Sequence, residues 1–577
     1  MTETRSFPSR GSLRRQSFTV IDVVVAVGVV VILVGVVRLG ESFAVPSSSV
    51  GTSVSTEPSH LPYYALLSLL RMFIALGLSV LFTLVYGTAA ARLRRARTVM
   101  IPLLDILQSV PVLGFLTVTV TFFISLFPGS SLGLECAAIF AVFTSQAWNM
   151  TFSFYHSLVS QPRELDEAAR SFRLTKWQRF WKLDVPSSMI GLVWNGMMSF
   201  GGGWFFLAAS EAITVAGTQH TLPGIGSYVA VAEANKDVGA ILLAIVVMVV
   251  MIIGVNVVFW RPLVAWSEKF RVETSEAAES PRSLTLDLLR RSRIPAMVGR
   301  PLKPVGRALD RATRPFGLAE VPLHTPASRR RAGDLAFLAV VAGLLGWAVY
   351  QTLSYFHDQG VLGQIPYCLQ LGFYTLIRVM VVVAVSTVLW VPVGAKIGMS
   401  PRLSRFAQPI VQVLASFPAI FLFPLAIIVF QFLGLSLEVG GIVLMMLGAQ
   451  WYILFNVIAG ASALPSDLRE MADQFRLTRR QRWTQLILPG IFPYYVTGGI
   501  TAAGGAWNAS IVAEWVQYGK IPIVAHGLGA YITQAAYRSD FAEVLIGVVV
   551  MSFYVVVVNR LLWRPLYRLA ETRYSLS

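Results

Sequence analysis

Twelve apolar runs of membrane-spanning length determine what this chain can fold into. A helix needs about 20 mostly apolar residues to cross a bilayer. Only 13% of the 577 residues are charged, against about 25% in soluble domains. We therefore expect an all-α polytopic membrane protein with about 12 transmembrane helices. The runs cover about 19–39, 62–91, 100–127, 133–156, 189–212 and 238–260, followed by 333–354, 366–395, 404–433, 436–460, 492–515 and 541–562.

The last six runs repeat the first six. From the fourth run onwards, residues of the same type recur 303 positions downstream, and over the second and third runs the offset is 307. Because six runs per copy leave both copies with the same orientation, the sequence predicts two parallel six-helix repeats rather than inverted ones. Matched pairs include Trp148 and Trp451, Trp204 and Trp507, and Trp260 and Trp563.

Each copy also contains one polar, basic segment between two apolar runs. Residues 164–188 read ELDEAARSFRLTKWQRFWKLDVPSS, and residues 467–491 read DLREMADQFRLTRRQRWTQLILPGI. A connection between neighbouring helices needs only a few residues, so a longer one kept twice predicts a docking element for a partner outside the membrane rather than an ordinary loop. Acidic residues suit the start of its first helix, and small residues allow close approach of a partner. These residues are Glu167, Ala168 and Ala169, with Glu470 and Ala472 in the second copy.

The distribution of basic residues predicts the orientation in the membrane. Four arginines follow the second run, between positions 92 and 97, whereas residues 40–61 contain no Lys or Arg. Because basic loops stay on the cytoplasmic side, both polar segments and both chain termini are expected in the cytoplasm. These loops also account for the formal charge of +17, so nucleic-acid binding is not expected.

This layout divides the chain into three regions. Residues 1–262 are the first repeat, 263–332 a basic cytoplasmic linker, and 333–577 the second repeat. The linker is expected to be a solvated tether, with contact to anionic lipid headgroups as the alternative. The basic N-terminus ahead of the run at 19–39 resembles a signal sequence. However, a cleaved signal has a shorter apolar core, so we expect this run to be retained as the first helix.

Charged residues at matched positions lie inside or at the ends of the apolar runs, where charges mark functional candidates. The two arginines are expected to snorkel to the lipid headgroups, with a substrate contact as the alternative. The four carboxylates lie at run ends on the external side, where they either cap helices or ring an external vestibule. The candidate pore or substrate residues are Arg71, Arg378, Glu135, Glu438, Glu211 and Glu514, together with Trp204 and Trp507 on the runs expected to line the pore.

A proline interrupts the third run and its repeat. The sequences Ser109-Val-Pro111 and Ser416-Phe-Pro418 are expected to break or kink their helices, because proline lacks a backbone N–H donor. Such breaks in both halves are typical of a translocation path. The chain contains no P-loop, so it is not expected to hydrolyse ATP. Its two cysteines, Cys136 and Cys368, give neither a disulfide framework nor a metal-binding spacing.

The two polar segments resemble the EAA loop of the binding-protein-dependent ABC permeases, the inner-membrane components of bacterial ABC importers. The resemblance covers most of both halves and is nearest to the nitrate, sulfonate, taurine and bicarbonate permeases. Its motifs are the Leu-Leu-Arg ending at 71, the two Ser-x-Pro sequences, and Gly-x-Gly-x-Tyr at 224–228 and 527–531. It implies a type I ABC importer fold with two permease domains fused in one chain and with coupling loops at about 160–188 and 463–491.

The same resemblance implies partners and a substrate class. It implies two cytoplasmic ABC ATPase subunits, which bind ATP and Mg²⁺ while this chain holds no cofactor. It also implies an external substrate-binding protein and a location in a bacterial inner membrane. The favoured substrate is a small oxyanion or a sulfonate, but the acidic external residues leave a cation or a neutral solute open. A secondary transporter driven by an ion gradient is a further alternative, although it leaves the paired cytoplasmic loops unexplained.

Both loops depart from the family pattern where the chain turns. The family has a glycine four residues after the second alanine, and an arginine stands there in both copies. Since a non-glycine residue adopts a positive φ only at a cost, either the turn differs or the first helix of the loop runs further. The implied ATPase-coupling residues are Glu167, Ala168, Ala169 and Arg173, and Glu470, Met471, Ala472 and Arg476, of which Met471 replaces a family alanine.

Overall fold

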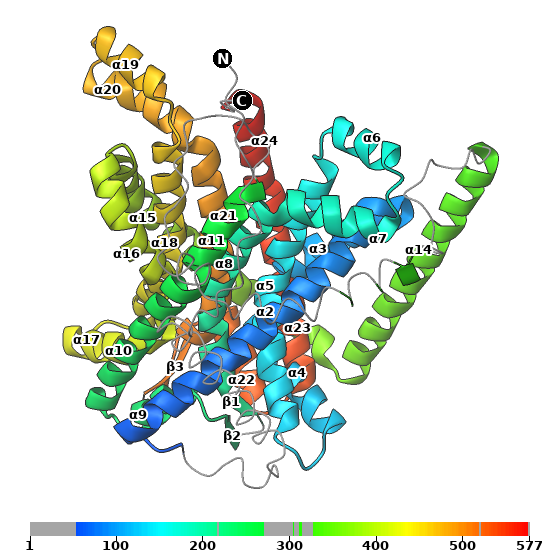
Figure 1. Cartoon of the computed structure of the whole chain (residues 1–577). Coiled ribbons are helices and arrows are strands. Elements are labelled where there is room, and N and C mark those ends of the chain that lie inside the picture. Colours follow the sequence, from blue (N-terminus) through cyan, green and yellow to red (C-terminus); the bar gives the residue numbers. More distant parts are fainter. Residues whose placement is uncertain are drawn as a thin grey trace, which may run out of the picture.

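The chain folds into two similar helical halves, shown in Figure 1 as a computed structural model. The first predicted span, at 19–39, and most of the predicted linker lie outside the described residues. The structure describes residues 54–215, 218–270, 327–518 and 521–574, together with a few positions between 304 and 313.

The helices of the first half follow the order of the apolar runs. Helix α5 packs between α2 and α8, and a short hairpin of β1 and β2 separates α8 from the last helices. The elements are α2 (Leu61–Arg92), α3 (Arg94–Ser109), α4 (Val112–Leu126), α5 (Leu132–Val159), α6 (Arg163–Ser171), α7 (Lys176–Arg179), α8 (Val185–Glu211), β1 (Ala212–Val215), β2 (Thr218–Thr221), α9 (Ile225–Ala234), α10 (Val238–Val255) and α11 (Arg261–Ser267).

The second half repeats this order after α14, whose expected counterpart in the first half, the run at 19–39, lies outside the described residues. Helix α18 packs between α15 and α21, as α5 does between its neighbours. The elements are α14 (Ala327–Asp358), α15 (Ile365–Gly398), α16 (Pro401–Ser416), α17 (Phe423–Leu433), α18 (Leu437–Ser462), α19 (Ser466–Gln474), α20 (Arg479–Gln481), α21 (Leu488–Ala513), β3 (Trp515–Tyr518), β4 (Ile521–Val524), α22 (Leu528–Tyr537), α23 (Phe541–Val558) and α24 (Arg564–Arg573).

Membrane-spanning helices make up most of the described part of the chain. Seven helices there are long and apolar enough to cross a membrane, or nine if each of two bent pairs counts as one span. Helices α5 and α8 coincide with predicted spans but are not among them, although their counterparts α18 and α21 are. The difference lies in polar residues such as Thr144, Gln146 and Thr151 on α5, which are buried inside the protein and so do not meet lipid.

The predicted breaks at the two prolines are confirmed. Helices α3 and α4 meet at 101°, and α16 and α17 at 83°. The residues before the prolines, Val110 and Phe417, have extended backbones with ψ of 123° and 128°. The proline ring disfavours the helical conformation for the residue that precedes it, so each expected span is divided into two limbs.

The second limb of each broken span packs against the other half. Val112, Leu113 and Leu116 of α4 belong to the hydrophobic cluster of the second half, whereas Phe421, next to α17, belongs to that of the first. The backbone N–H of Val112 also donates a hydrogen bond to Oδ1 of Asn508 on α21, at 2.8 Å. The two halves therefore interlock.

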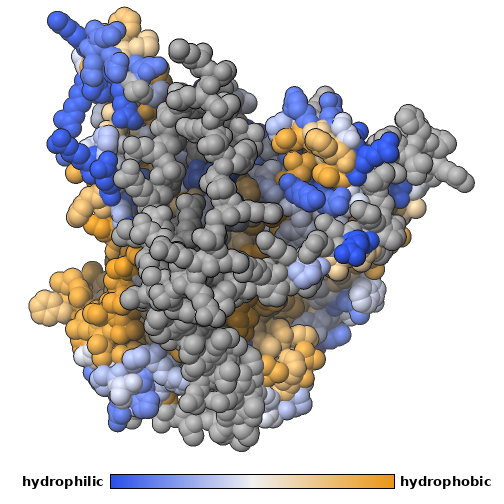
Figure 2. Space-filling model, viewed as in Figure 1, coloured by the Kyte–Doolittle hydropathy of each residue, from blue (hydrophilic) through white to orange (hydrophobic). Residues whose placement is uncertain are grey.

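The described part of the chain is mostly helical, as expected, and two short hairpins interrupt the helices. After α8 and again after α21, a two-stranded antiparallel hairpin forms, with Ala212 opposite Thr221 and Trp515 opposite Val524. Figure 2 shows apolar side chains gathered over the lower part of the visible face, and mainly hydrophilic ones on the protruding α19–α20 segment. The long apolar helix α14 lies along one edge of Figure 1, with its most apolar stretch exposed.

Candidate functional site

Both polar segments fold into a short helix, a tight turn and a second helix. Helix α6 ends in a Schellman motif: the N–H of Leu174 donates to the carbonyl of Ala169 at 3.1 Å, and that of Arg173 to Arg170 at 2.9 Å. Leu477 and Arg476 make the equivalent bonds at the end of α19. The first helix of each segment therefore stops at the position predicted for the family glycine.

Arginine occupies the left-handed position of this turn in both copies. Arg173 has a φ of 50° and Arg476 a φ of 48°, a region that favours glycine. Of the two outcomes expected from the missing glycine, a different turn or a longer helix, neither occurs. The surrounding hydrogen bonds keep the turn at the cost of backbone strain.

A capping box starts the second helix of each segment. The Thr175 hydroxyl accepts from the N–H of Gln178, whose side chain accepts from the N–H of Thr175. Thr478 and Gln481 repeat both bonds. In Figure 1, α6 with α7 and α19 with α20 project at the same end of the molecule, as the charge pattern predicted for two segments on one side of the membrane.

The exposed residues of these segments differ in part from those expected. Glu167 and Glu470 are exposed, and within the described chain neither forms an ion pair. Ala169 and Ala472 instead point inward, with 3% and 4% exposure, because they lie at the last turn of the helix where the Schellman motif folds back. The most exposed apolar side chains are Phe172 and Phe475, at 78% and 73%. The remaining expected coupling residues are Ala168, which is half-buried, and Met471, Arg173 and Arg476, which are exposed.

The candidate pore charges of the first half form one buried ionic cluster. Arg71 on α2 donates from Nε and Nη2 to Glu135 on α5, at 2.6 and 2.7 Å, and from Nη1 to Glu211 on α8, at 2.8 Å. All three side chains are at most 1% exposed. Nη1 of Arg71 also reaches the carbonyl of Pro223, at 2.8 Å.

This cluster also holds the start of α9. Ser68 donates to Glu211 and accepts from the N–H of Ile225, while the other carboxylate oxygen of Glu211 accepts from the N–H of Gly226, at 2.8 Å. A side chain at Gly224 would overlap the Glu211 carboxylate, which explains the Gly-x-Gly motif. The start of α9, where an anion would otherwise be stabilised, is thus occupied by the protein's own carboxylate.

The second half contains the corresponding ionic cluster, but one of its carboxylates is partly exposed. Arg378 contacts Glu514 at 2.8 Å and also pairs with Glu438, and Thr375 takes the place of the serine. Here the Glu438 side chain is 40% exposed. The exposed His526, which corresponds to Pro223, lies against it with Nδ1 at 2.6 Å from Oε1.

These positions correct two expectations. Arg71 and Arg378 do not snorkel to headgroups, because each is buried between two carboxylates of its own half. The four carboxylates do not ring one vestibule, because they converge in pairs on these two arginines. Such buried, hydrogen-bonded ion pairs have a structural role. The sequence did not indicate them, because the paired residues are 60 or more positions apart.

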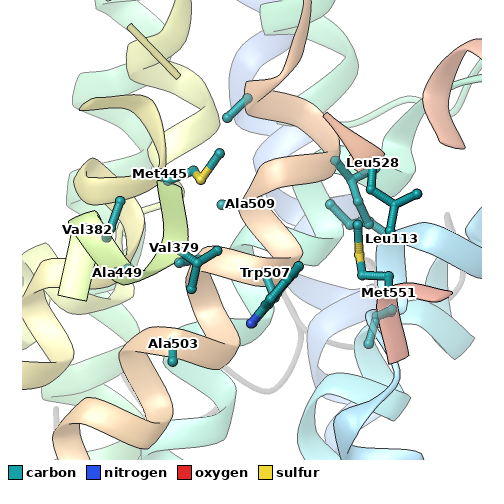
Figure 3. Packing of buried hydrophobic residues seen from close by; sticks show 14 of the residues in the cluster. Leu113, Val379, Val382, Met445, Ala449, Ala503, Trp507, Ala509, Leu528 and Met551 are labelled. Atoms are coloured by element: carbon teal, nitrogen blue, oxygen red, sulfur yellow. The ribbon is translucent and has the colours of Figure 1, made fainter. Parts of the chain in front are cut away.

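The candidate tryptophans are packing residues in the structure. Trp204 and Trp507 are each 2% exposed. The Trp507 indole stacks on Tyr554 with ring centroids 6.3 Å apart, and Figure 3 shows it among closely packed side chains such as Val379 and Met551. Neither tryptophan is among the described residues that line the cavity considered next.

A cavity of about 270 Å³ lies between the two halves, and we call it the interface chamber. Its walls come from matched elements: α4, α8 and α9 of the first half, and α17, α21 and α22 of the second. Among the described lining residues, only Glu233 on α9 is charged. The corresponding position in the second half, 303 residues downstream, is Ala536. In Figure 1, α4, α9, α17 and α22 lie in the part of the molecule away from the projecting α6 and α19, whereas α8 and α21 run towards those segments.

Comparison with known families shows which family the chain belongs to. A family described as the binding-protein-dependent transport system inner membrane component matches residues 83–261 and again 390–570, more than half of the sequence. The chain belongs to this family. It is an ABC transporter permease that carries two copies of the family domain in one polypeptide.

Similar curated proteins are permease proteins of bicarbonate, nitrate and taurine transport. A bicarbonate transport system permease protein from Synechococcus elongatus is 26% identical over 175 residues, covering 30% of this chain and 60% of that protein. A nitrate import permease protein from Synechocystis is 29% identical over 192 residues, or 33% and 65% of the two chains. A taurine transport system permease protein from Escherichia coli is 25% identical over 178 residues, or 31% and 61%. The ABC permease thus spans less than two thirds of each of these relatives.

Proposed function

We propose that this permease forms the translocation path of an ATP-driven importer for a small solute and docks two cytoplasmic ATPase subunits through its polar segments. One observation carries the proposal. Two segments of the same fold, one from each half, project at the same end of the molecule. Each presents an exposed phenylalanine and an exposed glutamate that forms no ion pair with any described residue.

The form of the segments supports a mechanical role. A Schellman motif followed directly by a capping box joins the two short helices of each segment through backbone hydrogen bonds rather than through a flexible loop. Each segment leads, through α8 or α21, into elements that line the interface chamber. Movement of the segment by a closing ATPase dimer would thus displace the walls of the interface chamber and change the access of the solute to it.

The resemblance and the relatives favour an external substrate-binding protein and a small oxyanion or sulfonate as the solute. Domain boundaries at 262 and 333 belong to the same proposal: α11 continues from the first domain to Ser267, and α14 leads into the second from Ala327. We place the polar segments and both chain termini in the cytoplasm, because the basic loops lie on that side.

Charge reversal at both segments tests the proposal. Glu167→Lys with Glu470→Lys is expected to abolish copurification of the ATPase subunits and ATP-dependent uptake into proteoliposomes, while the permease still folds. Glu57→Lys, at an exposed position near the start of α2, serves as the control. Uptake that persists in the double variant and requires a proton gradient would show a secondary transporter instead.

A further inference from the structure

We propose that the interface chamber binds an organic cation, a small solute that carries an ammonium or amidinium group on an apolar body. The inference rests on the proposed function, since it names the solute class of the same path, and it departs from the anion that the resemblance favours. It follows from three observations on the chamber walls.

First, the described lining residues of the chamber include one carboxyl group and no cation. Glu233 lines it, and within the described residues it makes no ion pair or side-chain hydrogen bond. No Lys, Arg or His is among the described lining residues. Apolar walls favour the neutral acid form of this carboxyl group, because an ionised carboxylate is costly there unless a positive charge or hydrogen-bond donors meet it. A cationic ligand supplies that partner and would stabilise the ionised form, whereas an anion would not.

Second, the wall contributed by the second half is aromatic. Trp515 and Tyr537 line the chamber with ring centroids 6.1 Å apart and a tilt of 41°, and Phe421 and Phe423 add further rings. The first half has Ala212 and Ala234 at the positions matching Trp515 and Tyr537. Aromatic faces attract cations, with tryptophan the strongest, so each half supplies a different part of a cation site.

Third, several groups that could hold an anion are already used. Helices α4, α9, α17 and α22 contribute lining residues, and free N–H groups at helix starts are natural anion donors. The Val112 N–H at the start of α4 donates to Asn508. Gly226 and Gly529 donate theirs to Glu211 and Glu514, both at 2.8 Å. The nearby arginines are likewise neutralised inside their clusters. A nitrate or sulfonate would find apolar walls and no cationic side chain among the described lining residues.

Direct binding to the full chain in lipid nanodiscs, without ATPase subunits, tests the inference. Calorimetric titration compares phenethylammonium and tetramethylammonium with the neutral 2-phenylethanol and with nitrate, bicarbonate and methanesulfonate. We expect at least one ammonium ion to bind about tenfold or more tightly than the neutral probe, the size of a partly desolvated cation–π contact. Tighter binding of the anions, or no ammonium binding at all, would overturn the inference.

Variants assign the binding to the chamber. Glu233→Gln should abolish the preference for the ammonium probe, whereas Glu57→Gln should not. The double variant Glu233→Ala with Ala536→Glu moves the carboxyl group to the opposite wall and should restore part of the preference for the ammonium probe. Trp515→Leu should weaken ammonium binding, and Trp515→Phe should largely keep it. An unchanged preference in Glu233→Gln would refute the site. Because no ATPase is present, that outcome leaves the coupling proposal standing, and lost coupling leaves this test unaffected.

Discussion

Arg173 and Arg476 lie 303 positions apart and hold the same left-handed backbone conformation, with φ of 50° and 48°. In both copies the residue stands between a helix that ends in a Schellman motif and a helix that starts with a capping box. The turn is therefore imposed by its surroundings and not by the residue that occupies it.

Glycine at these positions should relieve strain. Left-handed backbone at a non-glycine residue costs on the order of 1–3 kcal/mol, and the greater flexibility of unfolded glycine offsets about 0.5–1 kcal/mol of it. Arg173→Gly should thus slow hydrogen exchange at the Leu174 amide and preserve uptake. Arg173→Val, whose branched side chain disfavours the turn, should speed exchange. Faster exchange in the glycine variant would contradict this account.

The capping boxes should contribute measurably to the same segments. Thr175→Ala removes the hydroxyl that accepts from Gln178 and should destabilise α7 by about 1 kcal/mol. Thr175→Ser keeps the acceptor and should have little effect. Hydrogen-exchange mass spectrometry on a peptide covering Thr175–Phe180 measures both. Equal exchange in the two variants would mean that the cap is unimportant.

The two ionic clusters should differ in their tolerance of a missing charge. Glu135→Gln leaves Arg71 buried with a single carboxylate. Loss of one partner of a buried pair costs about 3–5 kcal/mol, so a large fall in thermal stability is expected. Glu438→Gln should cost much less, because the Glu438 side chain is 40% exposed and water can solvate what remains. The reverse order in a thermal unfolding assay would argue against this view of the second cluster.

Asn508 should stabilise the contact between the two halves. Its Oδ1 is the acceptor for the Val112 N–H at the start of α4, and an unsatisfied buried N–H costs about 1–3 kcal/mol. Asn508→Leu should lower the thermal unfolding temperature. Asn508→Asp keeps an acceptor for the Val112 N–H but loses the Nδ2 donor to the Gly504 carbonyl, so it should lower the unfolding temperature less than Asn508→Leu does. Similar losses in both variants would show that the hydrogen bond is not what matters.

Sequence periodicity predicted the features that depend on local chemistry. Apolar runs located the long helices, Pro111 and Pro418 located the breaks, and the 303-residue offset paired the segments at the projecting end. These three features depend on residues that are close in sequence or on the repetition of the sequence. A single sequence shows both kinds of signal.

Features that depend on long-range contacts were predicted incorrectly or missed. Arg71 was assigned to the lipid interface because its partners are 64 and 140 positions away. The hairpins were not predicted, since their anchoring bonds, such as Leu222 N–H to the Glu211 carbonyl, are tertiary. Glu233 was not among the candidate residues, because the candidates were charged or aromatic residues with the same type in both halves. The sequence signal for Glu233 is a mismatch between the repeats: a charged residue in the first half corresponds to an alanine, Ala536, in the second.

The unlike walls of the interface chamber also give a reason for joining the halves in one polypeptide. A permease assembled from two identical subunits would carry either two carboxylates or none, and either two aromatic pairs or none. With Glu233 in one half and Trp515 in the other, only a one-to-one assembly contains a single copy of each. Covalent linkage enforces that ratio in every molecule, so mispaired complexes cannot form within the chain.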